Sequence, residues 1–288
     1  MKLVAAVMLL VMGLMTSSCQ TSGSSQQPKI GLAGARASSY GIRPFPSPQE
    51  WIKISKEAQE RLGGRQPSLI WILGEVNMLR GKASCTLDMQ PLETQSKYIK
   101  FNNRNQEEYL TAFDKAGIKV FLQVEPGDAD VGELIKIVLD AYALHPSVIG
   151  FGVDVEWLSP GGTDGWGRKV SDKEAEQWEE LVKSYNSEYR LFLKHWDNRW
   201  MPPTYRGDII FVNDSQGFST LPSMKEEFLS WAEYFYPNPV AFQIGYDADR
   251  QIWEKLGDPM QLGAKLAEKV KQELSLYWVD FTLREVIK

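Results

Sequence analysis

Short runs of apolar, β-branched residues alternate along the chain with longer segments in which apolar residues recur every three or four positions. The short runs are typical of buried strands, and the longer segments are typical of amphipathic helices. The predicted strands are 29–36, 68–76, 118–125, 145–157, 208–213, 239–247 and 276–281. Because strands and helices alternate throughout, the pattern predicts an α/β fold with a parallel sheet.

So many strand–helix units in a chain of 288 residues favour one closed (β/α)8 TIM barrel over an open sheet. The pattern reveals about seven strands, so we expect either a degenerate strand within 249–257 or a distorted barrel. Residues 77–104 have no helical period and predict a long loop with hairpin content, in which 98–101 forms a short extra strand.

Capping residues mark the expected helix starts. Ser47 with Glu50 and Ser171 with Glu174 have the spacing of a capping box. The apolar stripe that follows Ser171 continues to Leu193 and predicts one long helix, which would place His195 near its end. Residues 223–226 predict a further helix start.

The stretch 145–157, HPSVIGFGVDVEW, is the one around which we expect the fold to be organised. The two-residue period of a strand puts Asp154 and Glu156 on one face, close to the strand's C-terminal end. Burying two like charges about 6–7 Å apart raises the pKa of at least one carboxyl group, an arrangement typical of carboxyl chemistry or ligand binding. The alternative is that one carboxylate only pairs with an Arg or Lys at the barrel mouth.

More carboxylates and aromatic residues fall at or near the C-terminal ends of predicted strands, where barrel enzymes place their working groups. The carboxylates are Glu75, Glu125, Asp154, Glu156, Asp214, Asp247 and Asp280. The aromatic residues are Trp157, Trp166, Tyr246 and Trp278. Carboxylates beside aromatic platforms suit uncharged sugars, whose apolar faces stack and whose glycosidic oxygen needs an acid.

Other chemistries lack their residues. Neither His145 nor His195 is placed beside a nucleophile, which argues against a Ser-His-Asp or Cys-His site and against a His-based metal centre. No phosphate-binding glycine motif opens a helix after a strand. The net charge is -5, and basic residues are scattered among acidic ones, which is not the footprint of a nucleic-acid partner. We therefore expect a monomer without metal, cofactor or nucleic acid.

Residues 1–18 have the charged start, short apolar run and small residues of an export signal. The run TSSC resembles a bacterial lipoprotein signal, although Thr16 stands where Leu is usual; the alternative is an ordinary secretory signal cut near Ser18. The resemblance implies a lipidated Cys19, a flexible tether over 19–28, and a single barrel domain over 29–288 anchored to the bacterial cell envelope. Cys85 is the only other Cys, so acylation of Cys19 would exclude an internal disulfide.

Residues 152–157, GVDVEW, resemble the fourth-strand signature DG-I-D-I-D-W-E of glycoside hydrolase family 18, the chitinase-like TIM barrels. Tyr246 and Asp247, on the sixth predicted strand, are similar to that family's Met-x-Tyr-Asp, and Trp278 stands where the family keeps a Trp under the sugar. The resemblance implies a glycosidase barrel in which these three residues position the sugar.

The match departs from the family at its proton donor, because Leu158 stands at the position of the acid Glu. One hypothesis makes Glu156 the acid, with Asp154 setting its pKa or Glu125 acting as the second carboxylate. A second hypothesis is a non-catalytic carbohydrate-binding surface lipoprotein, and a third is a structural surface protein with a plugged barrel mouth. The predicted sugar-binding residues are Glu75, Trp157, Asp214, Tyr246, Asp247, Trp278 and Asp280.

Overall fold

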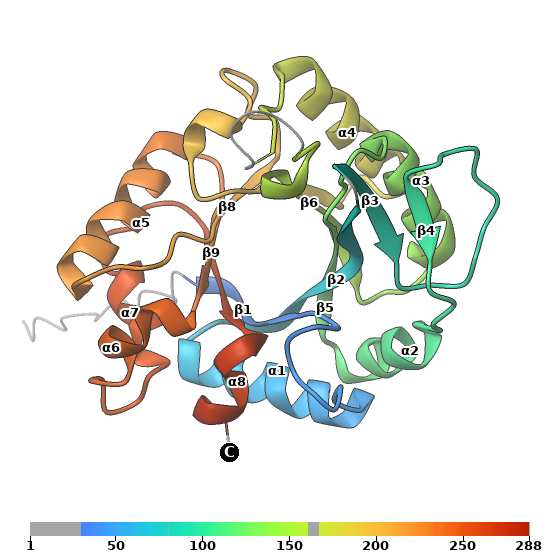
Figure 1. The fold of residues 1–288 in the computed structure, drawn as a ribbon. Helices are drawn as coiled ribbons and strands as arrows, with labels where there is room; N and C mark the ends of the chain where they lie inside the picture. Colours follow the sequence, from blue (N-terminus) through green and yellow to red (C-terminus); the bar gives the residue numbers. More distant parts are fainter. Residues whose placement is uncertain (1–29, 80, 161–166, 288) are drawn as a thin grey trace, which may run out of the picture.

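In the computed structural model, which describes residues 30–79, 81–160 and 167–287, eight parallel strands close into a (β/α)8 TIM barrel (Figure 1). In order around the barrel they are β1 (Ile30–Ala37), β2 (Gln66–Leu79), β5 (Lys119–Val124), β6 (Val148–Asp154), β7 (Arg190–Lys194), β8 (Ile210–Asn213), β9 (Val240–Ile244) and β10 (Leu274–Val279). The ring closes because β1 pairs in parallel with both β2 and β10. The predicted fold class is confirmed.

Helices cover the outside of the barrel (Figure 1). They are α1 (Pro48–Leu62), α2 (Glu107–Ala116), α3 (Val131–Tyr142), α4 (Asp172–Tyr185), α5 (Leu221–Phe235), α6 (Arg250–Trp253), α7 (Gln261–Ala267) and α8 (Asp280–Val286). The capping boxes predicted at Ser47 and Ser171 are both formed. The start predicted for α5 was wrong: Thr220 caps the helix, and its side chain accepts from the Ser223 N–H in the first turn.

Strand β7 is the one that the apolar pattern did not reveal. Helix α4 ends at Tyr185, and the chain turns before entering β7. Tyr189 and Leu193 are four residues apart, a spacing that puts them on one face of a helix and equally on one face of a strand. The long helix was therefore wrong, and His195 directly follows a strand instead of ending a helix. Residues 249–257 contain helix α6 and no degenerate strand.

Apolar side chains fill the inside of the barrel below its C-terminal end. This inner cluster is formed by Ile70, Phe121, Phe192, Ile210, Val212, Ala241 and Tyr277. A Cβ built on Gly152 of β6 would lie 2.0 Å from the Phe192 ring, so glycine at this position makes room for the neighbouring side chain. The lower part of the barrel is thus a packed core, as in other TIM barrels, and polar chemistry is confined to its upper end.

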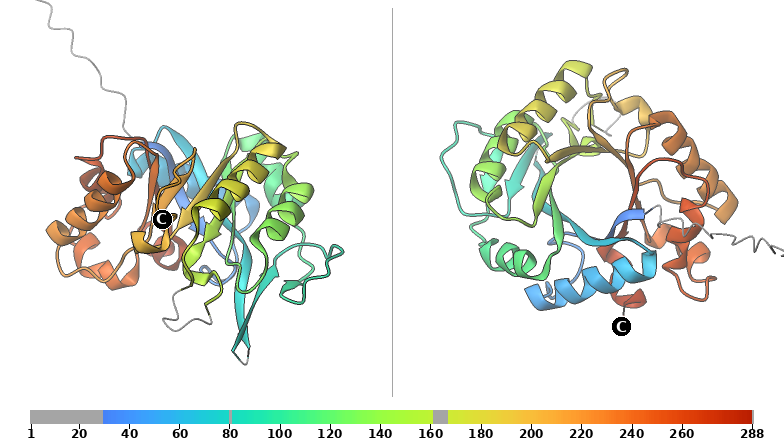
Figure 2. Two further views of the ribbon diagram at one scale, coloured as in Figure 1. Left: turned by 90° about the horizontal axis from the view of Figure 1, so that it is seen from above. Right: turned by 180° about the vertical axis from the view of Figure 1, so that it is seen from behind.

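Strand β2 continues past the barrel and forms an antiparallel hairpin with β3 (Lys82–Leu87). A short strand, β4 (Ile99–Phe101), pairs with β3, which confirms the extra strand and the hairpin content predicted for this region. The hairpin projects at the end of the molecule where the barrel strands terminate (Figure 2). Cys85 lies on β3 and is a buried free thiol.

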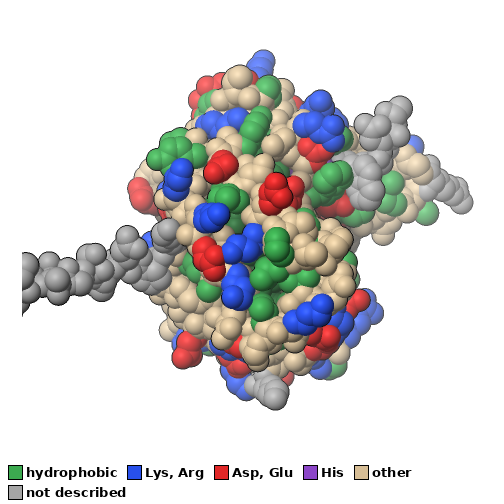
Figure 3. All heavy atoms as spheres, turned by 90° about the vertical axis from the view of Figure 1, so that its left-hand side faces the viewer, with side chains coloured by type: hydrophobic (Ala, Val, Ile, Leu, Met, Phe, Trp, Pro, Cys, Tyr) green, Lys and Arg blue, Asp and Glu red, His purple; other side chains and the backbone are tan. Residues whose placement is uncertain are grey.

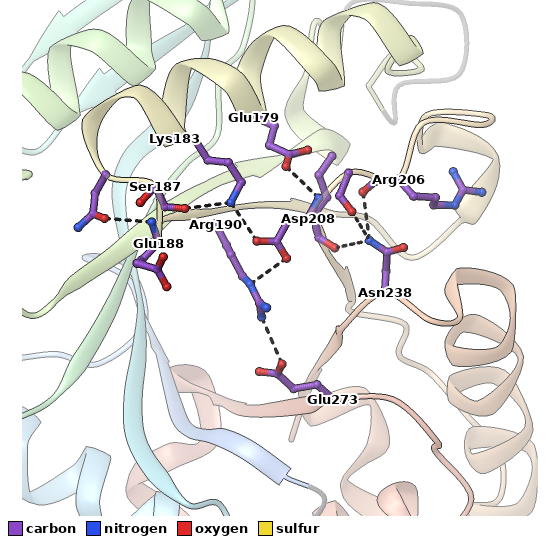
Figure 4. A network of polar contacts seen from close by, with 12 residues as sticks. Glu179, Lys183, Ser187, Glu188, Arg190, Arg206, Asp208, Asn238 and Glu273 are labelled. Atoms are coloured by element: carbon purple, nitrogen blue, oxygen red, sulfur yellow. Dashed lines mark hydrogen bonds and ion pairs between the residues drawn. The ribbon is translucent and has the colours of Figure 1, made fainter.

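Ion pairs and hydrogen bonds tie the strands together at their N-terminal ends (Figure 4). Arg190, at the start of β7, lies 3.1 Å from Asp208 Oδ1 and 3.3 Å from Glu273 Oε2. Lys183 of α4 adds a 2.9 Å contact to Asp208. Because these pairs are partly exposed, each contributes only about 0.2–1 kcal/mol. His145 lies at this same end, as predicted, and its Nδ1 is 2.7 Å from Asp114.

Basic and acidic side chains are interspersed on the side of the molecule that carries α5 and α7 (Figure 3). One such pair joins Lys225 of α5 to Glu268 after α7, at 2.5 Å.

Among the helices of the described residues, none has the length and apolarity needed to cross a membrane.

Candidate functional site

A layer of buried polar side chains crosses the barrel at the C-terminal ends of its strands, above the apolar core. Its members are Arg36, Gln123, Glu125, Asp154, Lys194, Asp214, Gln243 and Asp280. They come from, or directly follow, most of the barrel strands, so residues distant in sequence meet here. Burying so many polar groups costs free energy unless they are paired, and proteins commonly keep such clusters where they bind a ligand or take part in catalysis.

Lys194, the last residue of β7, is the centre of this layer and was missed by the sequence analysis. Its Nζ lies 2.6 Å from Asp154 Oδ2, 2.7 Å from Asp214 Oδ2 and 3.9 Å from Glu156 Oε2. Only 4% of the residue is exposed. The signal for it was present: a Lys at the end of an apolar run, LFLK, but that run was assigned to a helix.

Charge is unevenly balanced around this lysine, because three carboxylates approach one ammonium group. Burial raises the pKa of Asp154 well above its usual range, although Lys194 acts in the opposite direction. Burial also raises the pKa of Glu156; Lys194 opposes this rise, and the charge of Asp214 reinforces it. Burial alone would lower the pKa of Lys194, but Asp154 and Asp214 outweigh it and hold that pKa well above its usual value. The lysine stays charged, while Asp154 and Glu156 retain protons more readily than exposed carboxyl groups do.

Glu156 differs from Asp154 in its access to solvent. Strand β6 ends at Asp154, and a short 3₁₀ turn, Val155–Trp157, places Glu156 at the rim. About 17% of the Glu156 side chain is exposed, against 3% for Asp154. The prediction that both carboxylates face one side is met by their convergence on Lys194, but a turn rather than a strand delivers the second. Glu156 is therefore the carboxyl group that a ligand could reach.

Glu125 lies at another part of the barrel mouth. Its Oε1 accepts from the Tyr40 hydroxyl at 2.7 Å, and its Oε2 accepts from the Val76 N–H at 2.9 Å. Glu75, on β2, is close to it: burial raises the pKa of Glu75, and the charge of Glu125 acts in the same direction. Both predicted carboxylates are thus at the correct end, but both oxygens of Glu125 are already bonded within the protein.

Asp280 follows β10 and accepts hydrogen bonds from residues at the end of β1. It accepts from Arg36 Nη2 at 2.5 Å, and from the Ser38 N–H and hydroxyl at 2.6 and 2.7 Å. The Arg36 guanidinium also lies 4.5 Å from the centre of the half-exposed Phe281 ring. With 1% of its surface exposed, Asp280 acts as a structural tie between β1 and α8, so the prediction that it contacts a sugar was wrong.

Two residues predicted from the family resemblance lie outside the site. Trp278 is fully buried on the outer face of β10, where its ring is 5.8 Å from that of Trp253 and its Nε1 donates to Thr282. Successive strand residues point to opposite faces, and the neighbouring Tyr277 is the one that points inward. Asp247 is exposed and forms a 2.7 Å ion pair with Arg250. The prediction for Trp278 was wrong, and Asp247 is not among the residues that line the cavity described below.

Tyr246 is at the barrel mouth, where its hydroxyl donates to Gln243 Oε1 at 3.3 Å. It follows β9, which is the seventh barrel strand, so the prediction of a sixth-strand position was wrong because β7 had been missed. The sixth barrel strand is β8, and Asp214 directly follows it. Burial raises the pKa of the Tyr246 hydroxyl far above its usual value, so this group stays protonated.

Aromatic surface at this end comes from residues that the sequence analysis did not select. Trp196 and Phe281 are 37% and 48% exposed. The predicted Trp157 is half-buried in the turn after β6, and its carbonyl oxygen accepts from the Gly127 N–H. Leu158 has an apolar side chain and is buried, so this position supplies no carboxylate to the barrel mouth. Trp166 and Cys19 lie outside the described residues.

A cavity of about 670 Å³ opens beside the barrel mouth, between the segments that follow β7 and β8. Glu156 and Asp214 form its inner wall, and Trp196 and Trp231 are among its other lining residues. Such a volume lies within the range of small-molecule sites, about 300–1,000 Å³. Among the side chains of the described ranges, no group of His, Cys, Asp and Glu has the arrangement of a metal site.

Comparisons with known proteins reveal a similar fold but no sequence family. No protein-family model and no curated protein sequence matches the chain. Among solved structures, the β-glucuronidase of Parabacteroides merdae is similar over 87% of this chain, with a TM-score of 0.50 and 10% identity, and the chain covers 31% of that enzyme. A GH113 β-1,4-mannanase has a TM-score of 0.43 and 13% identity, over 88% of this chain and 89% of the mannanase. The first comparison supports the barrel fold alone, and the family 18 resemblance stays a prediction.

Proposed function

We propose that this protein is a glycoside hydrolase acting on oligosaccharides or polysaccharides, with Glu156 as its proton donor. The observation that carries the proposal is the position of Glu156: a carboxyl group with a raised pKa on the wall of a cavity that can hold a sugar. A general acid must be protonated before the reaction, and its carboxyl group must reach the bound substrate. Asp154 is too deeply buried for that role and positions Lys194 instead.

In the proposed reaction, Glu156 donates its proton to the glycosidic oxygen as the bond between that oxygen and the anomeric carbon breaks. Water adds to the anomeric carbon, and its proton passes to a second carboxylate. Asp214 suits this role better than the sequence candidate Glu125, because it lines the same cavity as Glu156 and lies 2.7 Å from the Lys194 ammonium group. Glu125, in contrast, has both oxygens bonded to Tyr40 and Val76.

Hydrolysis of a panel of chito-, cello- and manno-oligosaccharides tests the proposal through the appearance of new reducing ends. We expect Glu156→Gln to lower kcat by about 10²–10⁴-fold while substrates still bind. Asp247→Asn is the matched control, because this exposed carboxylate does not line the cavity and the variant should keep the parent's rates. If Glu156→Gln is as active as the parent on every cleaved glycan, Glu156 is not the acid.

A second candidate function is carbohydrate binding without hydrolysis, and the buried Leu158 at the family's acid position favours it. Under this alternative, the same oligosaccharides bind to the parent protein and are recovered intact. The absence of both binding and cleavage across the panel would exclude both functions for these sugars.

We also propose that the protein is exported and held at the bacterial cell envelope by a lipid on Cys19. The support is the TSSC run, together with the position of Ile30 at the start of β1. In a parallel barrel this end lies opposite the strand ends that carry Glu156 and Lys194. A tether leaving from Ile30 would therefore direct the candidate site away from the membrane, toward external glycans.

A further inference from the structure

The cavity beside Glu156 has walls from three parts of the barrel. The segment after β7 contributes Trp196 and Asp197, the segment after β8 contributes Asp214, and helix α5 contributes Glu227. Glu156 closes the inner side. The cavity is therefore continuous with the proposed acid but extends away from the barrel axis toward α5.

Negative charge predominates in this cavity. Among the described residues that line it, the acidic side chains are Glu156, Asp197, Asp214 and Glu227, of which Glu156 is protonated as the proposed acid, and the one cation is Arg199. The Arg199 guanidinium forms an ion pair with Asp197, and 71% of its side chain faces solvent. Lys194 lies behind the wall, where Asp154 and Asp214 share its charge. A ligand in the cavity thus meets a surplus of carboxylates.

Two of these carboxylates have hydrogen-bonding capacity left for a ligand. Asp214 is 5% exposed; its Oδ2 contacts Lys194, whereas its buried Oδ1 has no hydrogen-bond partner among the residues that the structure describes. Glu227 Oε1 accepts a long bond, 3.4 Å, from the Ser215 hydroxyl. Leaving a buried carboxylate oxygen unpaired is unfavourable, and a hydrogen-bond donor on a ligand would remove that cost.

An ammonium group fits these oxygens, since it carries three donors and no acceptor. Trp196, which is 37% exposed on the same cavity, offers an apolar face on which a sugar ring can stack and which attracts a nearby cation. A carboxylate or sulfate on the sugar would be repelled here, and an N-acetyl group would bring neither a positive charge nor three donors.

We infer that this cavity is a subsite for a sugar residue that carries a free, protonated amino group, so that the preferred substrates are de-N-acetylated amino-sugar oligomers. The inference rests on the proposed function, because it names the substrate class of the same site. Glu227 contacts the ammonium group, the negative charge of Asp214 lies on the same cavity wall, and Trp196 stacks against the ring.

Calorimetric titration with matched oligomers tests the inference. The probes are glucosamine tetramer, its fully N-acetylated counterpart, cellotetraose and a tetramer of galacturonic acid, each titrated into the full protein. We expect the glucosamine tetramer to bind at least about 10-fold more tightly than the acetylated and neutral tetramers, and the uronic acid tetramer not to bind. A rise in salt concentration should weaken the binding of the glucosamine tetramer more than that of the other tetramers, because salt screens the attraction between its ammonium groups and the carboxylates.

Glu227→Gln should reduce affinity for the glucosamine tetramer about 5–10-fold and leave cellotetraose affinity within twofold. Glu226→Gln is the matched control, since Glu226 is an exposed carboxylate one residue away on α5 that does not line the cavity. Equal affinity for the charged and neutral tetramers, or an equal loss for both in Glu227→Gln, would overturn the inference. Cleavage of neutral oligomers without amine preference would overturn it while leaving the proposed hydrolase intact. Amine-selective binding without cleavage would instead uphold the subsite and refute the hydrolase.

Discussion

The Lys194 ammonium lies 2.6 Å from the Asp154 carboxylate, although the two residues are 40 positions apart in sequence. Parallel pairing of β6 with β7 creates this contact, because Asp154 and Lys194 are direct register partners at the ends of their strands. The same ammonium reaches Asp214 after β8 at 2.7 Å. One cation thus joins three consecutive barrel strands directly behind the proposed acid.

Lys194→Met should destabilise the protein strongly, because it leaves buried carboxylates without their cation. We expect the free energy of unfolding at pH 7–8 to fall by about 3–5 kcal/mol. The loss should shrink at pH 4–5, where protonated carboxyl groups no longer need a partner. Urea unfolding of the parent and the variant at both pH values measures this effect.

Lys183→Met provides the control for that measurement. Lys183 also contacts a carboxylate, Asp208 at 2.9 Å, but both side chains are substantially exposed. This variant should lose no more than about 1 kcal/mol. Similar losses for the two variants would contradict the central role of Lys194.

Glu156→Gln should change the pH dependence of stability in a defined direction. Because the pKa of Glu156 is raised in the folded protein, its favourable contribution is complete below the ordinary value of 4.5 and is lost as pH rises through the folded pKa. The variant lacks this loss. Relative to the parent, Glu156→Gln should therefore become more stable between pH 4 and pH 8, as measured by urea unfolding across that range.

Glu174→Gln should show the opposite change in stability with pH, relative to the parent, in the same experiment. Burial tends to raise the pKa of Glu174, but hydrogen bonds from Arg168 and Ser171 outweigh it and lower that pKa. Its contribution is therefore present above pH 4.5 and lost as the pH falls through the folded pKa. This variant should lose stability relative to the parent at pH 7 and lose less near pH 3. Parallel pH curves for the two variants would refute the assignment for Glu156.

Trp278→Ala and Trp196→Ala should separate stability from ligand binding. Trp278 is fully buried and packs against Trp253, so its truncation should cost about 3–5 kcal/mol and lower the Tm. Trp196 lies on the cavity wall, so its truncation should weaken oligosaccharide binding with a much smaller change in Tm. Thermal melting and calorimetric titration measure both quantities. Loss of sugar affinity in a folded Trp278 variant, with Trp196→Ala unaffected, would reverse the assignment.

Cys19→Ser tests the proposed anchor. If the thiol carries a lipid, the variant should fail to incorporate labelled fatty acid and should leave the membrane fraction for the soluble envelope fraction. Cys85→Ser is the control, because Cys85 is a buried free thiol on β3 and should not affect fractionation. Unchanged membrane association of Cys19→Ser would favour the ordinary secretory signal.

Much of the architecture follows from local sequence signals. The alternation of apolar strands and amphipathic helices determines the α/β class, and the capping boxes at Ser47 and Ser171 determine where two helices begin. The position of Asp154 and Glu156 at a strand's end also follows from the sequence, because such signals act between residues a few positions apart.

The tertiary structure alone decided which side chains meet. Tyr189 and Leu193 fit a helical and an extended chain equally, so β7 became recognisable only through its pairing with β6 and β8. Its last residue, Lys194, was consequently missed as the partner of Asp154. The outward orientation of Trp278 likewise depends on the register of β10 with its neighbours. Strand pairing, register and ring closure are contacts between distant segments, and local periodicity carries no information about them.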